Sequence, residues 1–441
     1  MKNIYNIICS FVVVSLFFSS CKDEEGDIFD KTTTQRIKEK NAEIASILKS
    51  SDNGWRINYY PDPEVEGGYN MLMKFTGVED VTMQGDLFFP TGTHVSKYEM
   101  NGSQGPVLNF KTSNPVLHRL ADPELFYYGE GMLGDIEFVW QRTSINQDTL
   151  FFKGKKNQTS VRFIRFDKDW NEYIGKINTN INAFASRFFK RISISGGDSY
   201  EIGGYHAINR TIYPIVSENG KTLDYQKEIV LGFTDKGVEF YSPVKISDKK
   251  IQYLDYDAVS GKFNIADAGV EGTLDPINAP VTVFEGAKDS IFRNTDSYYF
   301  STYDATINTI VQSIKSKFAQ YEKASLILSR IGIVYTGTSY RLSLYIAVNG
   351  TFDSSNYVYV PLAVRKDTDR SDKVKLFASS RTFSGHTTYR DLIKNECTEL
   401  LTAIAGSNLT GKDYIVMPNF TYTNFLLGST DRDFSMSLNI W

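Results

Sequence analysis

The fold is decided by a hairpin-like stretch, residues 150–166, whose sequence is LFFKGKKNQTSVRFIRF. Its two ends, 150–153 and 160–166, are short runs rich in aromatic and β-branched residues, a composition typical of strands. Gly154-Lys155-Lys156-Asn157 between them is typical of a turn. Two strands joined by so short a connection run antiparallel. We therefore expect an antiparallel sheet or barrel in this part of the chain.

Strand signals of the same kind continue on both sides of this hairpin at intervals of about ten residues, with Gly, Asn and Asp between them. A second β-rich stretch covers 200–283, and its pattern over 238–263 echoes that of 136–166, which indicates a structural repeat. The further expected strands are 55–60, 69–76, 81–84, 95–100, 107–110, 136–141, 325–335, 341–348, 357–364, 374–377, 414–417 and 434–441.

Four segments show instead the period of amphipathic helices. The first is 34–50, for which Thr34 is the expected N-cap. The second is 170–191, the third begins after Asp304, and the fourth ends at Gly406. These patterns predict an α+β fold that is predominantly antiparallel β, as sheets or barrel-like, with about four amphipathic helices packed on it.

Changes of pattern along the chain indicate five segments. Residues 1–20 are expected to be a lipoprotein signal peptide, and 21–31 a lipidated cysteine with an acidic tether. Residues 32–168 would hold the first helix and an antiparallel β domain. Residues 169–290 would hold a helix and a second β region, and 291–441 would form a C-terminal α+β domain.

The N-terminal residues indicate export and attachment to a membrane. The apolar run 4–18 has the length of a signal peptide and is short for a membrane-spanning helix. Small residues lead directly to Cys21, as in a bacterial lipobox, where the cysteine becomes the lipidated first residue; a plain secretory signal is the alternative. The charged run 22–25 resembles the surface-export signal of Bacteroidetes lipoproteins, with a solvated linker as the alternative. We expect a lipid-anchored outer-membrane protein exposed at the cell surface.

Composition excludes several classes of protein. The chain has 441 residues, 48 Lys plus Arg, 52 Asp plus Glu and a net charge of −4, so bulk charge does not make it a nucleic-acid binder. A mean hydropathy of −0.29 excludes a polytopic membrane protein. Cys9 would leave with the signal peptide and Cys21 would be lipidated. Cys397 then has no partner for an intramolecular disulfide, and we expect a buried, inert thiol there.

No local catalytic motif is found in the sequence. The four histidines lack zinc-protease spacing, and nucleophile-elbow, Walker and dinucleotide-binding motifs are absent. The acidic clusters 367–372 and 167–172 lack the glycine of an EF-hand loop, which favours turn and helix-cap roles over a metal site. We therefore expect no metal and no cofactor. An enzyme whose site assembles only in space is the less favoured alternative.

Tyrosines are the better candidates for ligand contact. Adjacent residues of a strand face opposite sides, so some rings in Tyr59-Tyr60 and Tyr357-Val358-Tyr359 can face outward. Such a ring offers a flat apolar surface and a hydroxyl to a sugar or a peptide, and sheet packing is the competing role. The glycine-rich loop 126–134 is a more specific candidate. The expected ligand-binding residues are Tyr60, Tyr69, His118, Tyr127 and Tyr128.

Several short motifs resemble one uncharacterised family. They are 54–61, 67–70, 104–110, 114–118, 122–123, 134–138 and 150–156. Together they resemble the Bacteroidetes lipoprotein family called domain of unknown function 4302 (DUF4302), most clearly over residues 28–170. The resemblance implies no activity and no catalytic residues. It implies that the protein is similar to the accessory lipoproteins of nutrient-uptake loci, which are built around a SusC-like transporter and a SusD-like lid.

On these grounds the expected function is that of an accessory binding component that captures a peptide or glycan for a transporter. The expected partners are the outer membrane through Cys21, a SusC/SusD-like transporter and a peptide or glycan, with no nucleic acid. Two alternatives stay open, a hydrolase with a spatially assembled site and a structural subunit of a transporter complex without a small ligand.

Overall fold

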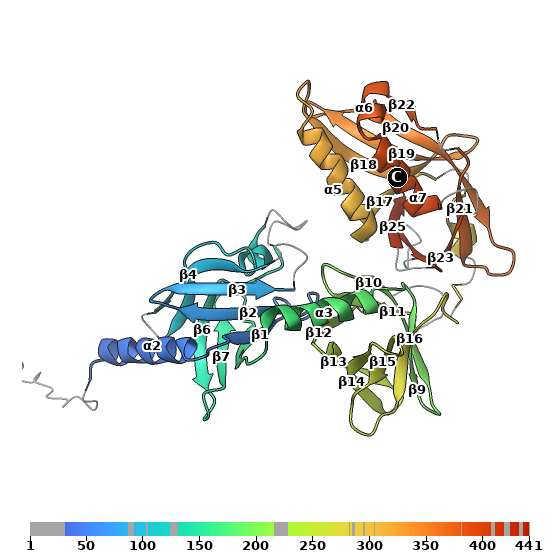
Figure 1. Ribbon diagram of the computed structural model, residues 1–441. Helices are drawn as coiled ribbons and strands as arrows, with labels where there is room; N and C mark the ends of the chain where they lie inside the picture. Colours follow the sequence, from blue (N-terminus) through green and yellow to red (C-terminus); the bar gives the residue numbers. More distant parts are fainter. Residues whose placement is uncertain are drawn as a thin grey trace, which may run out of the picture.

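The computed structural model describes residues 31–440 except for short segments. The segments left out are 87–91, 103–104, 124–130, 216–227, 282, 285–286, 294–295, 304, 381, 407–410, 419–423 and 432–434. Three β-rich bodies follow one another along the chain, and helices accompany each of them (Figure 1). The expected signal peptide and Cys21, together with Tyr127 and Tyr128, lie outside the described residues.

The first body is a closed barrel of eight strands in which each strand pairs antiparallel with the next in the chain. The pairing of β1 with β8, with Trp55 opposite Arg165, closes it, and closure leaves no open sheet edge. Its elements are α2 (Thr33–Lys49), β1 (Trp55–Tyr59), β2 (Tyr69–Thr76), β3 (Asp80–Gly85), β4 (His94–Asn101), β5 (Val107–Phe110), the 3₁₀ helix η1 (His118–Ala121), β6 (Glu137–Thr143), β7 (Thr149–Gly154) and β8 (Ser160–Arg165).

The second body is another closed eight-stranded antiparallel barrel. The pairing of β16 with β9, with Leu274 opposite Ile192, closes it. Its elements are α3 (Trp170–Phe184), β9 (Lys190–Ile194), β10 (Ser199–His206), β11 (Thr211–Pro214), β12 (Ile229–Phe233), β13 (Gly237–Ile246), β14 (Lys249–Asp257), β15 (Lys262–Ile265) and β16 (Gly272–Pro276).

The two barrels repeat one plan. In each, an amphipathic helix is followed by a five-residue connection, 50–54 or 185–189, and then by the barrel. Each helix buries its apolar face in its own barrel core, α2 through residues such as Ile44 and α3 through residues such as Ile177. The architecture is thus repeated, although the two segments whose patterns resemble each other are not equivalent: 136–166 holds the sixth to eighth strands of its barrel, and 238–263 the fifth to seventh of the other.

The third body is a strongly curved half-barrel of nine antiparallel strands in the order β19-β18-β17-β25-β24-β23-β21-β20-β22, with a further pairing of β19 and β20. Helices α5 and α7 share one core with its inner face, through residues such as Ile314 and Leu400. Its elements are α4 (Ala287–Ser290), β17 (Tyr298–Tyr303), α5 (Ala305–Ala319), β18 (Leu326–Tyr335), β19 (Tyr340–Val348), β20 (Thr351–Lys366), β21 (Lys373–Ala378), β22 (Ser384–Gly385), α6 (Thr387–Leu392), α7 (Lys394–Ala405), β23 (Lys412–Pro418), β24 (Asn424–Ser429) and β25 (Ser435–Ile440).

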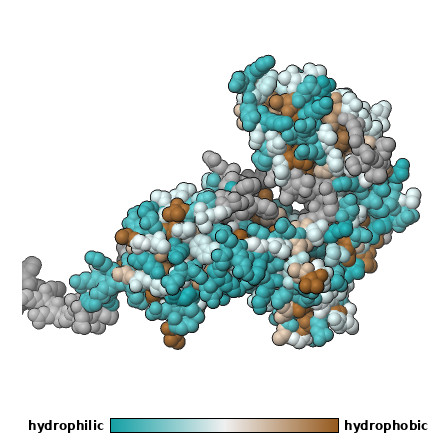
Figure 2. Space-filling model, viewed as in Figure 1, coloured by the Kyte–Doolittle hydropathy of each residue, from teal (hydrophilic) through white to brown (hydrophobic). Residues whose placement is uncertain are grey.

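The chain is therefore mostly antiparallel β with packed helices, and the expected fold class is confirmed. Figure 2 shows a largely hydrophilic surface with apolar residues scattered over it, as on most globular proteins. Cys397 of α7 is buried and free. Burial, with Glu396 beside it, raises the pKa of the Cys397 thiol to about 12, and the expected burial of this cysteine is confirmed.

Three expectations about single elements were wrong. The helix expected over 170–191 ends at Phe184, because Phe188 and Phe189 after it are buried in the half-barrel core and β9 follows. The last expected helix is broken at Ile393, whose φ of −116° is not helical. The N-cap of α2 is Thr32, which forms a capping box with Gln35, and not Thr34.

Candidate functional site

The two barrels meet along β2, which is buried on both faces. Tyr69 and Met71 face the core of the first barrel, whereas Leu72 belongs to the core of the second. The amide of Gly68 donates to the Leu231 carbonyl at 3.0 Å, and Gly68 bridges Gly232 in parallel register. We call this contact the barrel junction.

Glycine is required at the barrel junction because the two backbones approach so closely. A Cβ at Gly67 would lie 2.4 Å from the Leu231 carbonyl oxygen, and one at Gly232 would lie 2.5 Å from the Tyr60 hydroxyl. Both distances are below van der Waals contact. A side chain at Gly67 would therefore force the two backbones apart, and one at Gly232 would displace the Tyr60 ring.

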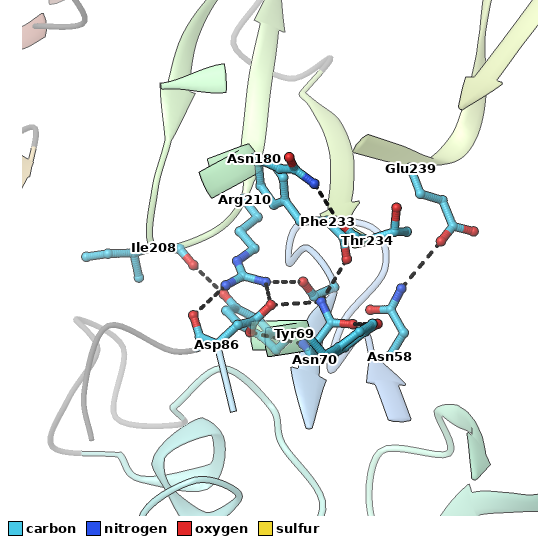
Figure 3. Close-up of polar contacts among 12 residues, drawn as sticks. Asn58, Tyr69, Asn70, Asp86, Asn180, Ile208, Arg210, Phe233, Thr234 and Glu239 are labelled. Carbon is cyan, nitrogen blue, oxygen red and sulfur yellow. Dashed lines mark hydrogen bonds and ion pairs between the residues drawn. The ribbon is translucent and has the colours of Figure 1, made fainter. Parts of the chain in front are cut away.

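A buried ion pair lies at the centre of the barrel junction (Figure 3). The Arg210 guanidinium, from the turn between β10 and β11, donates through Nη1 to Asp86 Oδ2 at 3.0 Å and through Nη2 to the Asp86 carbonyl at 3.0 Å. The two side chains are only 2% and 0% exposed. Arg210 also donates to the Gly68 carbonyl at 2.5 Å and stacks on the Tyr69 ring, 4.5 Å from its centroid.

Asn70 extends this network into both barrels. Its backbone amide and its Nδ2 donate to the two carboxylate oxygens of Asp86, at 3.0 and 2.8 Å. Nδ2 also donates to the Phe233 carbonyl at 2.7 Å, and Tyr173 of α3 donates to Asn70 Oδ1 at 3.2 Å. The buried charges thus have most of the hydrogen bonds that burial demands, and only Arg210 Nε is left without a partner among the described residues of this network.

A second, more open part of the barrel junction holds aromatic and polar side chains. Asn58 Nδ2 donates to Glu239 Oε2 at 3.4 Å, and the Tyr60 ring packs on Tyr241 with centroids 4.9 Å apart. Tyr241 is 45% exposed and Tyr253, opposite Glu239 in the β13–β14 pair, is 41% exposed. We call these five side chains the junction face.

Two polar atoms of the junction face are buried without a hydrogen-bond partner among the described residues, Asn58 Oδ1 and the Tyr60 hydroxyl. Burial, followed by the neighbouring Glu239 carboxylate, raises the pKa of Tyr60 well above its usual value. Burial likewise raises the pKa of Glu239, and Arg162 and Arg56 oppose that shift. Unpartnered buried atoms are unfavourable, so the junction face is suited to accept hydrogen bonds from a ligand.

The carboxyl group of Glu66 lies at the rim of the barrel junction, where burial disfavours its charged form. Asn209 Nδ2 donates to Glu66 Oε1 at 3.1 Å, while Glu66 Oε2 is buried with no hydrogen-bond partner in the described part of the chain. Burial, together with Asp62 and Glu228, raises the pKa of Glu66 to about 8. Glu66 is therefore largely protonated near neutral pH.

The structure brings two of the expected binding residues to the barrel junction. Tyr60 belongs to the junction face, and Tyr69 lies deeper, with its hydroxyl on the Ile208 carbonyl. His118 begins η1, where its half-buried Nδ1 accepts from the Asn114 amide at 3.0 Å and burial lowers its pKa. Tyr127 and Tyr128 lie outside the described residues.

The acidic clusters have the turn and cap roles favoured from the sequence. Asp169 caps α3 by accepting from the Glu172 amide, and Asp367 accepts from the Asp369 amide at 2.7 Å. Buried Asp372 pairs with Arg370 at 2.8 Å. In the part of the chain that the structure describes, no group of three His, Cys, Asp or Glu side chains is placed to hold a metal ion.

Sequence reasoning missed Asp86, Arg210 and Glu239. Arg210 and Asp86 are 124 residues apart in the chain, and Asn58 and Glu239 are 181 residues apart. No local pattern marks such pairs. The one available signal was the pair Gly67-Gly68, since adjacent glycines before a strand indicate a close backbone approach.

A family model described as "Domain of unknown function (DUF4302)" matches residues 25–258. The chain belongs to this family. The DUF4302 match covers α2, the first barrel, α3 and the second barrel as far as β14, and so includes the whole barrel junction. No curated protein matches the chain.

Among solved structures, the chain is similar to a double mutant of the vaccine antigen transferrin binding protein B from Haemophilus parasuis Hp5. The identity is 9% and the TM-score 0.13, over 86% of this chain and 65% of that one, which is less than two thirds of its length. At that score the similarity carries no argument about fold or ligand.

Arg210→Met and Asp86→Asn should each lower the free energy of unfolding of the barrels by about 3–5 kcal/mol, because each leaves a buried charged partner alone. The double variant should lose less than the sum. Chemical denaturation followed by tryptophan fluorescence measures this. The control is Lys97→Met, which breaks an exposed pair with Asp80 and should cost less than about 1 kcal/mol. Equal losses in Arg210→Met and the control would contradict the role of the buried pair.

Glu66→Gln should change the pH dependence of stability. The folded-state pKa of about 8 lies above that of the unfolded chain, so the wild type loses stability as pH rises from the ordinary carboxyl pKa to about 8. The variant does not ionise, and its advantage in melting temperature should grow over that range and then level off. Glu64→Gln, exposed on the same loop, is the control and should keep the wild-type profile. Parallel profiles for wild type and Glu66→Gln would refute the assignment.

Proposed function

We propose that this protein is a lipid-anchored binding protein of the outer-membrane surface, an accessory component of a nutrient-uptake system that holds a peptide or glycan for a SusC/SusD-like transporter. The observation that carries the proposal is the junction face. It combines two exposed tyrosine rings with a half-buried carboxyl and two buried oxygen atoms that have no partner among the described residues.

The chemistry of the junction face suits an uncharged, hydroxyl-rich or amide-rich ligand. Tyr241 and Tyr253 can pack on a flat apolar surface of a sugar or peptide. Asn58 Oδ1 and Glu239 can accept hydrogen bonds from hydroxyl or amide groups, and the Tyr60 hydroxyl can donate or accept. A ligand that donates hydrogen bonds to the unpartnered oxygen atoms gains affinity, because these atoms have no hydrogen-bond partner in the free protein.

The barrel junction supports the proposal in a second way. Its backbone contacts and buried ion pair hold Asn58 and Tyr60 of the first barrel against Glu239 and Tyr241 of the second. A site whose parts are fixed before the ligand arrives loses less conformational entropy on binding. The junction face is therefore preorganised although it is built from two bodies.

The membrane location rests on the N-terminal sequence. Among the described residues no helix has the length and apolar character needed to cross a membrane. Helix α2, with exposed residues through most of its first half, leads from the lipobox side of the chain to the first barrel. A lipid on Cys21 would thus attach the protein to the bilayer through α2, with the barrels in water.

Cys21→Ser should move the protein from the membrane fraction to the soluble fraction, because it removes the residue that would carry the acyl chains. Fractionation of cells that express each form measures the change, and protease added to intact cells tests exposure of the wild type. Cys397→Ser is the matched control and should leave the location unchanged. A wild-type protein that is soluble, or that external protease cannot reach, would contradict the proposed location.

Tyr253→Ala and Glu239→Gln should each weaken ligand binding by about tenfold or more, since each removes roughly 1.4 kcal/mol or more of contact. The purified chain from Cys21 onward would be screened by thermal shift against neutral oligosaccharides and short peptides, and each hit measured by calorimetry. Val259→Ala, at an exposed position of the same barrel, is the control. Absence of any hit, or binding unchanged by both variants, would overturn the ligand role. Co-purification with a transporter without any hit would favour the structural-subunit alternative.

A further inference from the structure

The outer face of the half-barrel carries three arginines on three adjacent strands, and each lies over aromatic rings. Arg330 of β18 lies 5.8 Å from the ring centroids of both Tyr299 and Phe352. Arg341 of β19 and Arg365 of β20 make similar contacts. The Arg341 guanidinium is 4.6 and 4.7 Å from the rings of Tyr357 and Tyr359, and that of Arg365 is 5.0 Å from Phe377.

The alternation of side chains places these groups on the face away from the core. Leu342 and Leu344 of β19 and Val358 and Val360 of β20 are buried in the core with α5 and α7. Arg341 lies between inward-facing residues of β19. On β20, Arg365 is an odd number of residues from the inward-facing Val358 and Val360. Residues of alternate parity on a strand face opposite sides. The arginines therefore share the outer face.

The strand register aligns the three arginines along one diagonal. Arg330 pairs with Tyr345, which lies four residues from Arg341 on β19. Arg341 pairs with Pro361, which lies four residues from Arg365 on β20 and in the same direction. Four residues along a strand and one strand across correspond to about 14 Å per step. The diagonal thus spans about 28 Å.

Aromatic rings fill the space between the first two arginines. The centroids of Tyr345 and Phe352 are 6.1 Å apart, those of Tyr345 and Tyr357 are 5.6 Å apart, and those of Tyr357 and Tyr359 are 5.4 Å apart. Arg341 also donates to the Tyr357 hydroxyl at 3.3 Å. The Arg341 guanidinium is thus held in place over the rings, and a guanidinium suits planar, bidentate contact with an anion.

Two of these charges, Arg341 and Arg365, have no acidic partner among the described residues. No carboxylate forms an ion pair with Arg341 or Arg365 among the described residues, and Arg341 Nε is buried there without a hydrogen-bond partner. Lys375 on the neighbouring strand, by contrast, pairs with Asp413 at 3.3 Å. A positive diagonal on a chain of net charge −4 is complementary to an anionic ligand.

The geometry also limits the kind of anion. β18, β19 and β20 are each paired on both sides, so a peptide cannot add to them as a further strand. DNA carries a charge about every 3.4 Å per strand, far denser than one per roughly 14 Å. A polymer with flat rings and sparse charges fits better, because a neutral ring can pack on the tyrosines between Arg330 and Arg341.

We propose that this diagonal binds an acidic oligosaccharide in which sugars bearing a carboxylate or sulfate are separated by neutral sugars. Each anionic group is held by one arginine, and the neutral sugar between Arg330 and Arg341 packs on the tyrosine rings. The site lies in a different body from the junction face and takes a ligand of different charge, so it is a second binding site of the protein.

The test uses the chain from Cys21 onward and calorimetry with a hyaluronan decasaccharide, whose alternate sugars carry a carboxylate. Arg341→Gln and Arg365→Gln should each weaken binding by about tenfold, since each removes a charge-assisted contact. Arg341→Lys should restore only part of the loss, because an ammonium cannot make the planar contact. Binding should weaken as salt rises. Lys323→Gln, an exposed position, is the control for charge alone.

Three results would overturn the proposal. They are no binding of hyaluronan to the wild type at millimolar concentration, equal binding by wild type and Arg341→Gln, and tighter binding of single-stranded DNA or a poly-glutamate peptide than of hyaluronan through the same arginines. Equal melting temperatures of wild type and variants would show that all remain folded. Tyr253→Ala should leave hyaluronan binding unchanged, so this test is independent of the junction face.

Discussion

The buried pair of Arg210 and Asp86 is the constraint on which the arrangement of the barrels depends. Taking a guanidinium and a carboxylate out of water costs several kcal/mol per ion, and only their mutual contact and a full set of hydrogen bonds offset that cost. Each barrel supplies one ion, so each buried charge depends on the other barrel for its partner. Asn70 adds to these hydrogen bonds by donating to Asp86 and to the Phe233 carbonyl.

The two-sided burial of β2 follows from this constraint. An isolated barrel would present Asn70 and Leu72 to water, but here the second barrel and α3 cover them. The same contact brings Tyr60 and Asn58 beside Glu239 and assembles the junction face from two bodies. Glycine at 67 and 68 makes the close approach of the barrels possible, because neither residue has a side chain that would clash there.

Much of the secondary structure was predictable from periodicity, since a strand with one face in a barrel core alternates apolar and polar residues. The hairpin of 150–166 is β7 and β8, and residues 107–110 are β5. The strand β24 was missed because Phe425, Leu426 and Leu427 are all buried, so its apolar run has no alternation. Tyr60 could be selected from an adjacent tyrosine pair, whereas its partner Glu239 could not, because nothing local distinguishes it from other strand carboxylates.

The sequence by itself determined the antiparallel β class, the helix before each barrel and the family to which the chain belongs, because hydrophobic period, turn residues and short motifs are local properties. Which charges are buried together, and which tyrosines lie at a junction, depends on contacts between distant segments and is visible only in the folded chain. The tertiary structure also decided that three arginines align across β18, β19 and β20, since strand register is set by pairing between distant segments. The sequence shows only that an arginine is charged. The fold determines its environment: Arg210 is buried against a carboxylate, whereas Arg341 lies over tyrosine rings on an outer face.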